Sequence, residues 1–111
     1  MKYEQGDIVL IPFPFTDLSQ SKKRPAIILT NEKSNTQGDY LLVQVTSKSN
    51  FDLILELKEA DYKGHSLPVS SYVRYNKIFC LSEKLIEKKI SAVTKAFSIK
   101  INAQIAAIID R

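Results

Sequence analysis

Hydrophobic positions fall in short runs or alternate with polar ones over most of the chain, as is typical of strands. Apolar, largely β-branched runs at residues 7–11 and 26–30, bounded by Gly, Pro and Asn, predict two strands. After the turn signal at residues 37–39, the run at residues 40–46 predicts a third strand. Residues 51–57 carry Phe or Leu at every second position, which predicts a fourth strand with one face on the core.

The second half of the chain is expected to continue the sheet and then change period. A helical turn and loop are predicted for residues 59–68, and strands for residues 69–75, 77–82 and around 88–90. Ile101, Ile105, Ile108 and Ile109 then recur at helical spacing, with Thr94 or Ser98 available as the N-cap. The chain has no repeat, low-complexity tract or linker. Residues 1–111 are therefore expected to form one domain, a mainly β (α+β) unit with a strongly bent antiparallel sheet and a C-terminal helix.

Composition is ordinary for a globular domain and narrows the range of partners only slightly. The 111 residues are 44% hydrophobic and 25% charged, and the formal net charge of +4 favours an anionic partner. The lone Cys80 excludes a disulfide framework and is expected to be a buried apolar residue of a strand. The first residues lack the apolar core of a signal peptide, and no apolar run approaches the roughly 20 residues that span a bilayer. We therefore expect a cytoplasmic protein.

Three adjacent cations stand before the second predicted strand, in the run Lys22-Lys23-Arg24-Pro25. Proline biases the residue before it towards an extended backbone, so Arg24 is expected at the entrance of the strand. A positioned guanidinium beside two ammonium groups suits the binding of a phosphate backbone. The alternative is a surface arginine that covers apolar area with its stem.

Other polar side chains follow the third strand or alternate along a later one. Thr46, Ser47 and Lys48 lie near the cations if the sheet curls, although the hydroxyls could equally cap a turn through the backbone. Tyr72 and Arg74 are expected on one face of their strand, with Tyr75 and Lys77 on the other. These planar and cationic groups suit stacking and phosphate contact, or the tyrosines simply fill the strand.

The residues that usually carry catalysis are sparse. His65 is the single histidine and is expected to be solvated in a loop. No spacing of His, Cys, Asp and Glu predicts a metal site, so we expect no metal and no cofactor.

Several short segments together carry a family resemblance. In order, they are Gly6-Asp7-Ile8-Val9, the run Lys23-Arg24-Pro25-Ala26-Ile27-Ile28-Leu29, Val45-Thr46-Ser47, Ser71-Tyr72-Val73-Arg74 and Lys77-Ile78-Phe79. With the strand and helix that end the chain, they make the sequence resemble the PemK/MazF growth-inhibitor toxins of type II toxin–antitoxin systems over nearly its whole length.

The resemblance implies an SH3-like barrel with a C-terminal helix, usually a homodimer, that acts as a metal-independent endoribonuclease on single-stranded RNA, often mRNA. In such enzymes the 2′-hydroxyl attacks the adjacent phosphorus and leaves a cyclic phosphate and a 5′-hydroxyl. By this resemblance Arg24 and Thr46 are the catalytic residues. The expected RNA-binding residues are Lys22, Lys23, Ser47, Lys48, Arg74 and Lys77.

The same resemblance implies a protein partner, an antitoxin with an acidic, partly disordered tail that folds over the basic groove. Two other functions stay open on this fold: a non-catalytic binding module, and a toxin directed at DNA gyrase.

The chain departs from the family pattern in its first loop. Many members have a longer, glycine-rich loop with an acidic residue before the Arg-Pro step. Here the loop runs from Thr16 to Lys23, lacks glycine and carries Asp17 well upstream. In addition, Lys77 stands where some relatives have glutamine. The family's RNA sequence preference is therefore not expected to transfer.

Overall fold

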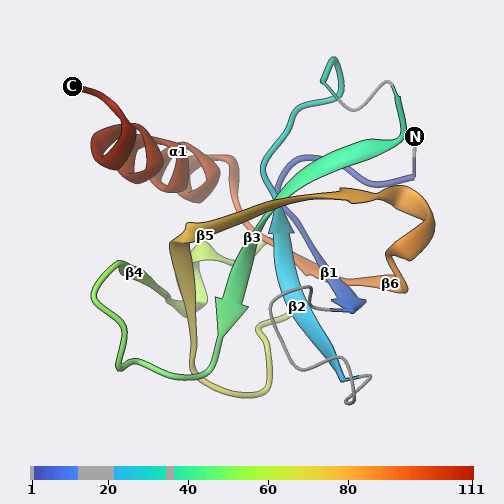
Figure 1. The fold of residues 1–111 in the computed structure, drawn as a ribbon. Coiled ribbons are helices and arrows are strands. Elements are labelled where there is room, and N and C mark those ends of the chain that lie inside the picture. The colour runs from blue at the N-terminus through green and yellow to red at the C-terminus, as the bar shows by residue number, and fades with distance from the viewer. Residues whose placement is uncertain (1, 13–21, 35–36) are drawn as a thin grey trace.

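Six strands form one antiparallel sheet, and a helix follows it (Figure 1). The computed structural model describes residues 2–12, 22–34 and 37–111. Within these residues the strand order is β4-β5-β3-β2-β1-β6. The elements are β1 (Asp7–Pro12), β2 (Lys23–Ile28), β3 (Asp39–Thr46), β4 (Ile54–Leu57), β5 (Ser71–Ser82), β6 (Lys88–Ala92), the short 3-10 helices η1 (Glu59–Asp61) and η2 (Glu83–Leu85), and helix α1 (Lys95–Ile109).

The central strands β1, β2 and β3 are buried on both faces, which is why they are apolar runs and do not alternate. One core cluster lies beneath α1 and contains Ile8, Ile27, Val43, Val45, Val73, Phe97 and Ile101, among others. The second cluster lies on the opposite face and includes Val9, Ile11, Ala26, Ile28, Tyr40, Leu42 and Phe79. Neighbouring residues of each strand thus contribute to different clusters.

The sheet bends sharply in β5, which is drawn in gold in Figure 1. Gln44 of β3 pairs with Arg74, whereas the preceding Val43 pairs with Ile78, so residues 75–77 lie between the two paired segments. Such an irregularity bends a strand and increases its twist. The two strands predicted at 69–75 and 77–82 are in fact one strand with this bend inside it.

The bent sheet brings its two edges together. Tyr62, which follows β4, forms an isolated antiparallel bridge with Val93, which follows β6. On either side of this bridge, the Lys63 N–H donates to the Ala92 carbonyl at 2.8 Å and the Thr94 N–H donates to the Asp61 carbonyl at 2.9 Å. The predicted strongly bent antiparallel sheet with a C-terminal helix is confirmed.

Helix α1 begins at Lys95 with Thr94 as its N-cap, so Thr94 and not Ser98 has that role. The Thr94 Oγ1 accepts a hydrogen bond from the Phe97 N–H at 3.2 Å. Phe97 and Ile101 point into the core, whereas Ile109 at the end of the same apolar stripe is 67% exposed. The predicted helical spacing is correct, but the isoleucines of the last turn of α1 are exposed and not packed on the sheet.

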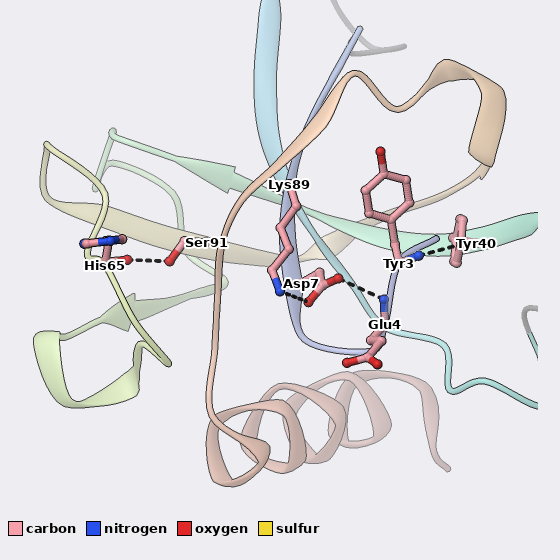
Figure 2. Close-up of polar contacts among 7 residues, drawn as sticks. All are labelled: Tyr3, Glu4, Asp7, Tyr40, His65, Lys89 and Ser91. Carbon is pink, nitrogen blue, oxygen red and sulfur yellow. Dashed lines mark hydrogen bonds and ion pairs between the residues drawn. The ribbon is translucent and has the colours of Figure 1, made fainter. Parts of the chain in front are cut away.

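The Gly-Asp step before β1 has a structural role. Gly6 has φ +91, a conformation that side chains disfavour, and a Cβ there would meet the Val93 carbonyl at 3.2 Å. Asp7 is buried, accepts the Glu4 N–H at 2.9 Å and pairs with Lys89 Nζ of β6 at 3.2 Å (Figure 2). These contacts attach the N-terminal turn to the edge strand.

A tyrosine joins the N-terminal segment to the sheet. The Tyr40 hydroxyl accepts from the Tyr3 N–H at 3.3 Å (Figure 2) and donates to Glu83 at 3.2 Å. Burial raises the pKa of Tyr40 above its ordinary value of 10.0, so the hydroxyl stays protonated and able to donate at neutral pH.

Three sequence predictions need correction. Cys80 is exposed because it pairs with the exposed Leu41 at an uncovered part of the β3–β5 ladder. The fourth strand begins at Ile54 and not at Phe51. The second strand begins at Lys23 and ends at Ile28, earlier than the predicted 26–30.

No helix in the described ranges is long and apolar enough to cross a membrane.

Candidate functional site

Pro25 determines how β2 leaves its neighbour near Arg24. The ladder between β2 and β3 has Ala26 opposite Gln44 and does not reach Pro25, which has no N–H to donate. Figure 1 shows the start of β2 and the end of β3 diverging from each other. Arg24 stays paired with Ile11 of β1, so it is held inside a strand although β3 no longer pairs with it.

Arg24 and Thr46 occupy corresponding positions on the two diverging strands. Counting two residues from Ala26 towards the start of β2, and two from Gln44 towards the end of β3, reaches Arg24 and Thr46. Because side chains alternate along a strand, both lie on the face that carries Ala26 and Gln44. The register therefore brings a guanidinium and a hydroxyl to the same end of the sheet.

Strand β5 adds a second arginine to this face. Arg74 pairs with Gln44, and Tyr72 pairs with Thr46. We call the set Arg24, Gln44, Thr46, Tyr72 and Arg74 the arginine face. The Arg74 Nη1 lies 3.5 Å from the Gln44 Oε1, at the long end of the hydrogen-bond range.

Both arginines carry a buried donor without a hydrogen-bond partner among the described residues, the Nε atoms of Arg24 and Arg74. An unpaired buried donor costs about 1–3 kcal/mol, and native proteins keep few of them. Both residues are only half-buried, so part of each stays open to the surface although its Nε is covered. Two cations thus stand on one face with donors that the described protein atoms do not satisfy.

Thr46 is half-buried, and its hydroxyl has a local partner. The Oγ1 accepts the Lys48 N–H at 3.1 Å, which is the turn cap considered as an alternative for this residue. The cap fixes the oxygen but leaves the hydroxyl proton free to donate elsewhere. Capping and ligand binding are therefore compatible at Thr46.

The remaining candidate residues divide between the arginine face and other places. Lys22 and Lys23 are exposed at the start of β2, and Ser47 and Lys48 are exposed in the turn after β3, so all four border the arginine face. Lys77 is half-buried in the bend of β5, three residues beyond Arg74. Tyr75, considered for stacking, belongs to the core cluster under α1.

Two further contributors were not predicted from the sequence, Gln44 and Phe51. Gln44 is buried and pairs with Ala26 on one side and with Arg74 on the other. The sequence feature that could have identified it is a polar residue that interrupts the apolar run of β3. Phe51 lies with its ring 3.6 Å from the Arg74 guanidinium carbon. Phe51 could not be recognised as a site residue from the sequence, because its alternation with Leu53 was interpreted as the core-facing pattern of a strand.

His65 is exposed, and its backbone carbonyl accepts the Ser91 hydroxyl (Figure 2). Within the described residues there is no group of three or more His, Cys, Asp and Glu side chains placed to hold a metal ion. The shortened first loop with Asp17 lies largely outside the described residues.

Known proteins of similar fold carry antitoxin and endoribonuclease descriptions. A mycobacterial endoribonuclease in complex with its cognate antitoxin has a TM-score of 0.76 at 19% identity, covering 96% of this chain and 94% of that one. A MazE–MazF complex from Deinococcus radiodurans has a TM-score of 0.78 at 17% identity, covering 98% and 97%. The Mycobacterium tuberculosis toxin MazF-mt6 has a TM-score of 0.70 at 14% identity, covering 94% and 96%. At these identities the likeness establishes the fold.

A comparison with curated protein sequences found no match. The sequence does match a family, described as PemK-like, MazF-like toxin of type II toxin–antitoxin system, over residues 4–109. This match includes every strand, the helix and the arginine face. The chain therefore belongs to the PemK-like, MazF-like toxins of type II toxin–antitoxin systems.

Proposed function

We propose that the chain is a cytoplasmic, metal-independent endoribonuclease that cleaves single-stranded RNA. The observation that carries the proposal is the register that puts Arg24 and Thr46 at the same end of the sheet, where β2 and β3 diverge. Family membership supports it, as do the structures of similar fold described as endoribonucleases.

The proposed chemistry is transfer of the phosphoryl group within the RNA strand. The 2′-oxygen bonds to the adjacent phosphorus while the bond from phosphorus to the 5′-oxygen breaks. The 2′-hydroxyl loses its proton to a solvent water, and the 5′-oxygen gains one from Arg24, which solvent then reprotonates, so the products are a cyclic phosphate and a 5′-hydroxyl. The enzyme has to hold the nucleotide in line and stabilise negative charge on the phosphoryl oxygens.

Arg24 suits charge stabilisation better than proton removal. A guanidinium holds its proton too tightly to serve as a general base, but it binds phosphate through two parallel N–H bonds. We propose that Arg24 stabilises the negative charge that develops on the phosphoryl oxygens and that it donates a proton to the leaving oxygen. Thr46 donates its free hydroxyl proton to a phosphoryl oxygen while its oxygen stays held by the Lys48 N–H.

The bordering cations would contact the RNA backbone. Lys22, Lys23 and Lys48 are exposed point charges around the arginine face, and Ser47 adds a hydroxyl beside them. Arg74 extends the cationic surface across β5, and Lys77 extends it into the bend of that strand. Backbone contacts of this kind give affinity and position without reading sequence.

The wild-type chain is expected to cleave a single-stranded RNA in the presence of EDTA. The reason is that Arg24 supplies the positive charge that a metal ion provides in other nucleases. Gel analysis of end-labelled RNA, with mass spectrometry of the new ends, should show a cyclic phosphate. Cleavage that stops with EDTA and returns with a divalent ion would contradict the mechanism. Growth arrest in a bacterial host with intact mRNA and altered DNA supercoiling would favour the gyrase-directed alternative.

Two protein partners belong to the proposal, a second copy of the chain and an antitoxin. Similar structures contain an antitoxin, and apolar side chains stay exposed in the described ranges, among them Leu41, Ile99, Ile108 and Ile109. An acidic antitoxin tail would cover the same cations that bind RNA.

Sedimentation of the purified chain should give about twice its mass of 12.6 kDa, and a larger complex when the antitoxin is added. RNA binding by that complex should fall, because the tail and the RNA compete for one surface. A complex that binds and cleaves RNA as well as the free chain does would contradict the shared surface.

A further inference from the structure

The side of the sheet that carries the arginine face continues onto β4, the edge strand beyond β5 (Figure 1). Glu56 of β4 pairs with Tyr72, which in turn pairs with Thr46. Directly paired residues of antiparallel strands share one side of the sheet, so Glu56 lies on the same side as Thr46. The register between β2 and β3 already places Arg24 level with Thr46. One row across four strands therefore consists of Arg24, Thr46, Tyr72 and Glu56.

The two ends of this row have opposite chemistry. Arg24 is a cation that only donates hydrogen bonds, whereas the Glu56 carboxylate only accepts them. Glu56 is exposed, and its carboxylate has no hydrogen bond or ion pair with the residues that the structure describes. Arg74, opposite Ile54 on the same side of the sheet, is a diagonal neighbour of Glu56 and offsets the repulsion between a carboxylate and a bound phosphate. The row thus has a proton donor at one end and a proton acceptor in contact with solvent at the other.

Attack by the 2′-hydroxyl needs a donor and an acceptor on opposite sides of the phosphorus. The attacking and the leaving oxygen lie roughly in line through the phosphorus atom during phosphoryl transfer. Because Arg24 protonates the leaving 5′-oxygen, the acceptor of the 2′-proton has to lie on the other side of the bound phosphate. Thr46, which donates to a phosphoryl oxygen, lies between Arg24 and Glu56 in the row. Glu56 is therefore on the side of the attacking 2′-hydroxyl.

The width of the row leaves room for one water between Glu56 and the RNA. Glu56 is two strands away from Thr46, which is about 10 Å at the usual spacing of strands. A phosphate, a 2′-hydroxyl and one water, joined by hydrogen bonds of about 2.8 Å, fill a gap of that size. A general base can act through one such water.

We propose that Glu56 is the general base of the reaction and acts through the water that removes the 2′-proton. The inference rests on the proposed function and adds the acceptor to which that water passes a proton. As the 2′-oxygen bonds to phosphorus, the water takes the 2′-proton and gives one of its own to the Glu56 carboxylate. The neutral carboxylic acid then releases this proton to solvent, while Arg24 protonates the leaving 5′-oxygen.

Glu56→Gln keeps the size of the side chain but cannot take up the proton. Single-turnover cleavage at saturating enzyme should fall about 100-fold, the lower end of what a general base contributes. RNA binding should not weaken, because the substitution removes a negative charge from the surface that binds the RNA backbone. Glu32→Gln is the matched control, because Glu32 is exposed beyond the end of β2 that is opposite to Arg24, and it should cleave at the wild-type rate.

Chemical rescue separates a general base from a structural role of Glu56. Glu56→Ala leaves space for a small carboxylate at the edge of the sheet. Added acetate or formate should therefore restore part of its cleavage rate in proportion to the concentration. Chloride at the same ionic strength should restore nothing, and neither anion should help Glu56→Gln, in which the space is filled.

An RNA with sulfur in place of the leaving 5′-oxygen distinguishes the two ends of the row. A thiolate leaves without being protonated, so Arg24→Ala should recover part of its rate on this RNA, whereas Glu56→Gln should stay slow. Recovery of Glu56→Gln on the sulfur substrate would place Glu56 at the leaving oxygen and overturn the inference. A wild-type rate in Glu56→Gln, or no rescue of Glu56→Ala by acetate or formate, would overturn it while the proposed nuclease stands. A wild type that cleaves neither RNA would contradict the nuclease and this inference together.

Discussion

Arg24→Ala is expected to lower the rate of RNA cleavage roughly 10²–10³-fold, the usual cost of removing one preorganised donor to a developing negative charge. The expectation follows from the geometry of β2. Arg24 is paired with Ile11 on one side and lies beyond the β3 ladder on the other, so its backbone is fixed in a strand before substrate binds. Single-turnover cleavage of a labelled RNA at saturating enzyme measures the effect without a contribution from binding.

Three variants in the same assay distinguish this role from general positive charge. Lys23→Ala removes the neighbouring exposed cation and should lower the saturated cleavage rate no more than a few-fold, because its main effect is on RNA binding. Arg24→Lys keeps the positive charge but loses the bidentate hydrogen-bonding geometry, so its cleavage rate should stay well below that of the wild type. Thr46→Ala removes one hydrogen bond to a charged group and should cost about 10-fold. Equal losses from Lys23→Ala and Arg24→Ala would show that Arg24 contributes no more to the cleavage step than any nearby positive charge.

The existence of most strands could be predicted from the sequence, because burial on two faces leaves an apolar run. The segments at 7–11 and 40–46 agree with β1 and β3 to within one residue at each end. The single strand β5 could not be recognised, since its bend lies at residues 75–77 and the exposed Asn76 resembles a break between two strands. A bend inside one ladder depends on the partner strand, which a local pattern does not contain.

The candidate site was partly predictable for a similar reason. Arg24 stood out locally because it precedes Pro25 at the start of an apolar run, whereas Thr46 became a candidate catalytic residue through the resemblance to the PemK/MazF toxins. Their alignment depends on the register between β2 and β3, which only the structure shows. Phe51 and Gln44 contribute through contacts with Arg74, a residue that is distant in the sequence. The cationic residues of the site could thus be predicted from the sequence, whereas the tertiary contacts of these residues could be found only in the structure.

Phe97→Ala is expected to reduce the free energy of unfolding by about 3–5 kcal/mol, the range for losing a buried aromatic ring. Phe97 is 2% exposed and is one of the two buried residues of α1. Its ring belongs to the cluster that contains Val43 and Val73, so it attaches the helix to the sheet. A loss of this size is a large part of the roughly 5–15 kcal/mol of a typical domain.

Ile99→Ala is the matched control, because Ile99 lies two residues further along α1 and is 60% exposed. Removing its side chain should change stability by no more than about 0.5 kcal/mol. Urea unfolding at low protein concentration measures both variants, and an unchanged slope against urea confirms that the same surface is exposed on unfolding. Equal destabilisation by the two substitutions in the dilute chain would mean that α1 does not pack through Phe97. If Ile99→Ala destabilises only at high concentration, the outer face of α1 is buried by a second copy, and the inner face still holds the helix to the sheet.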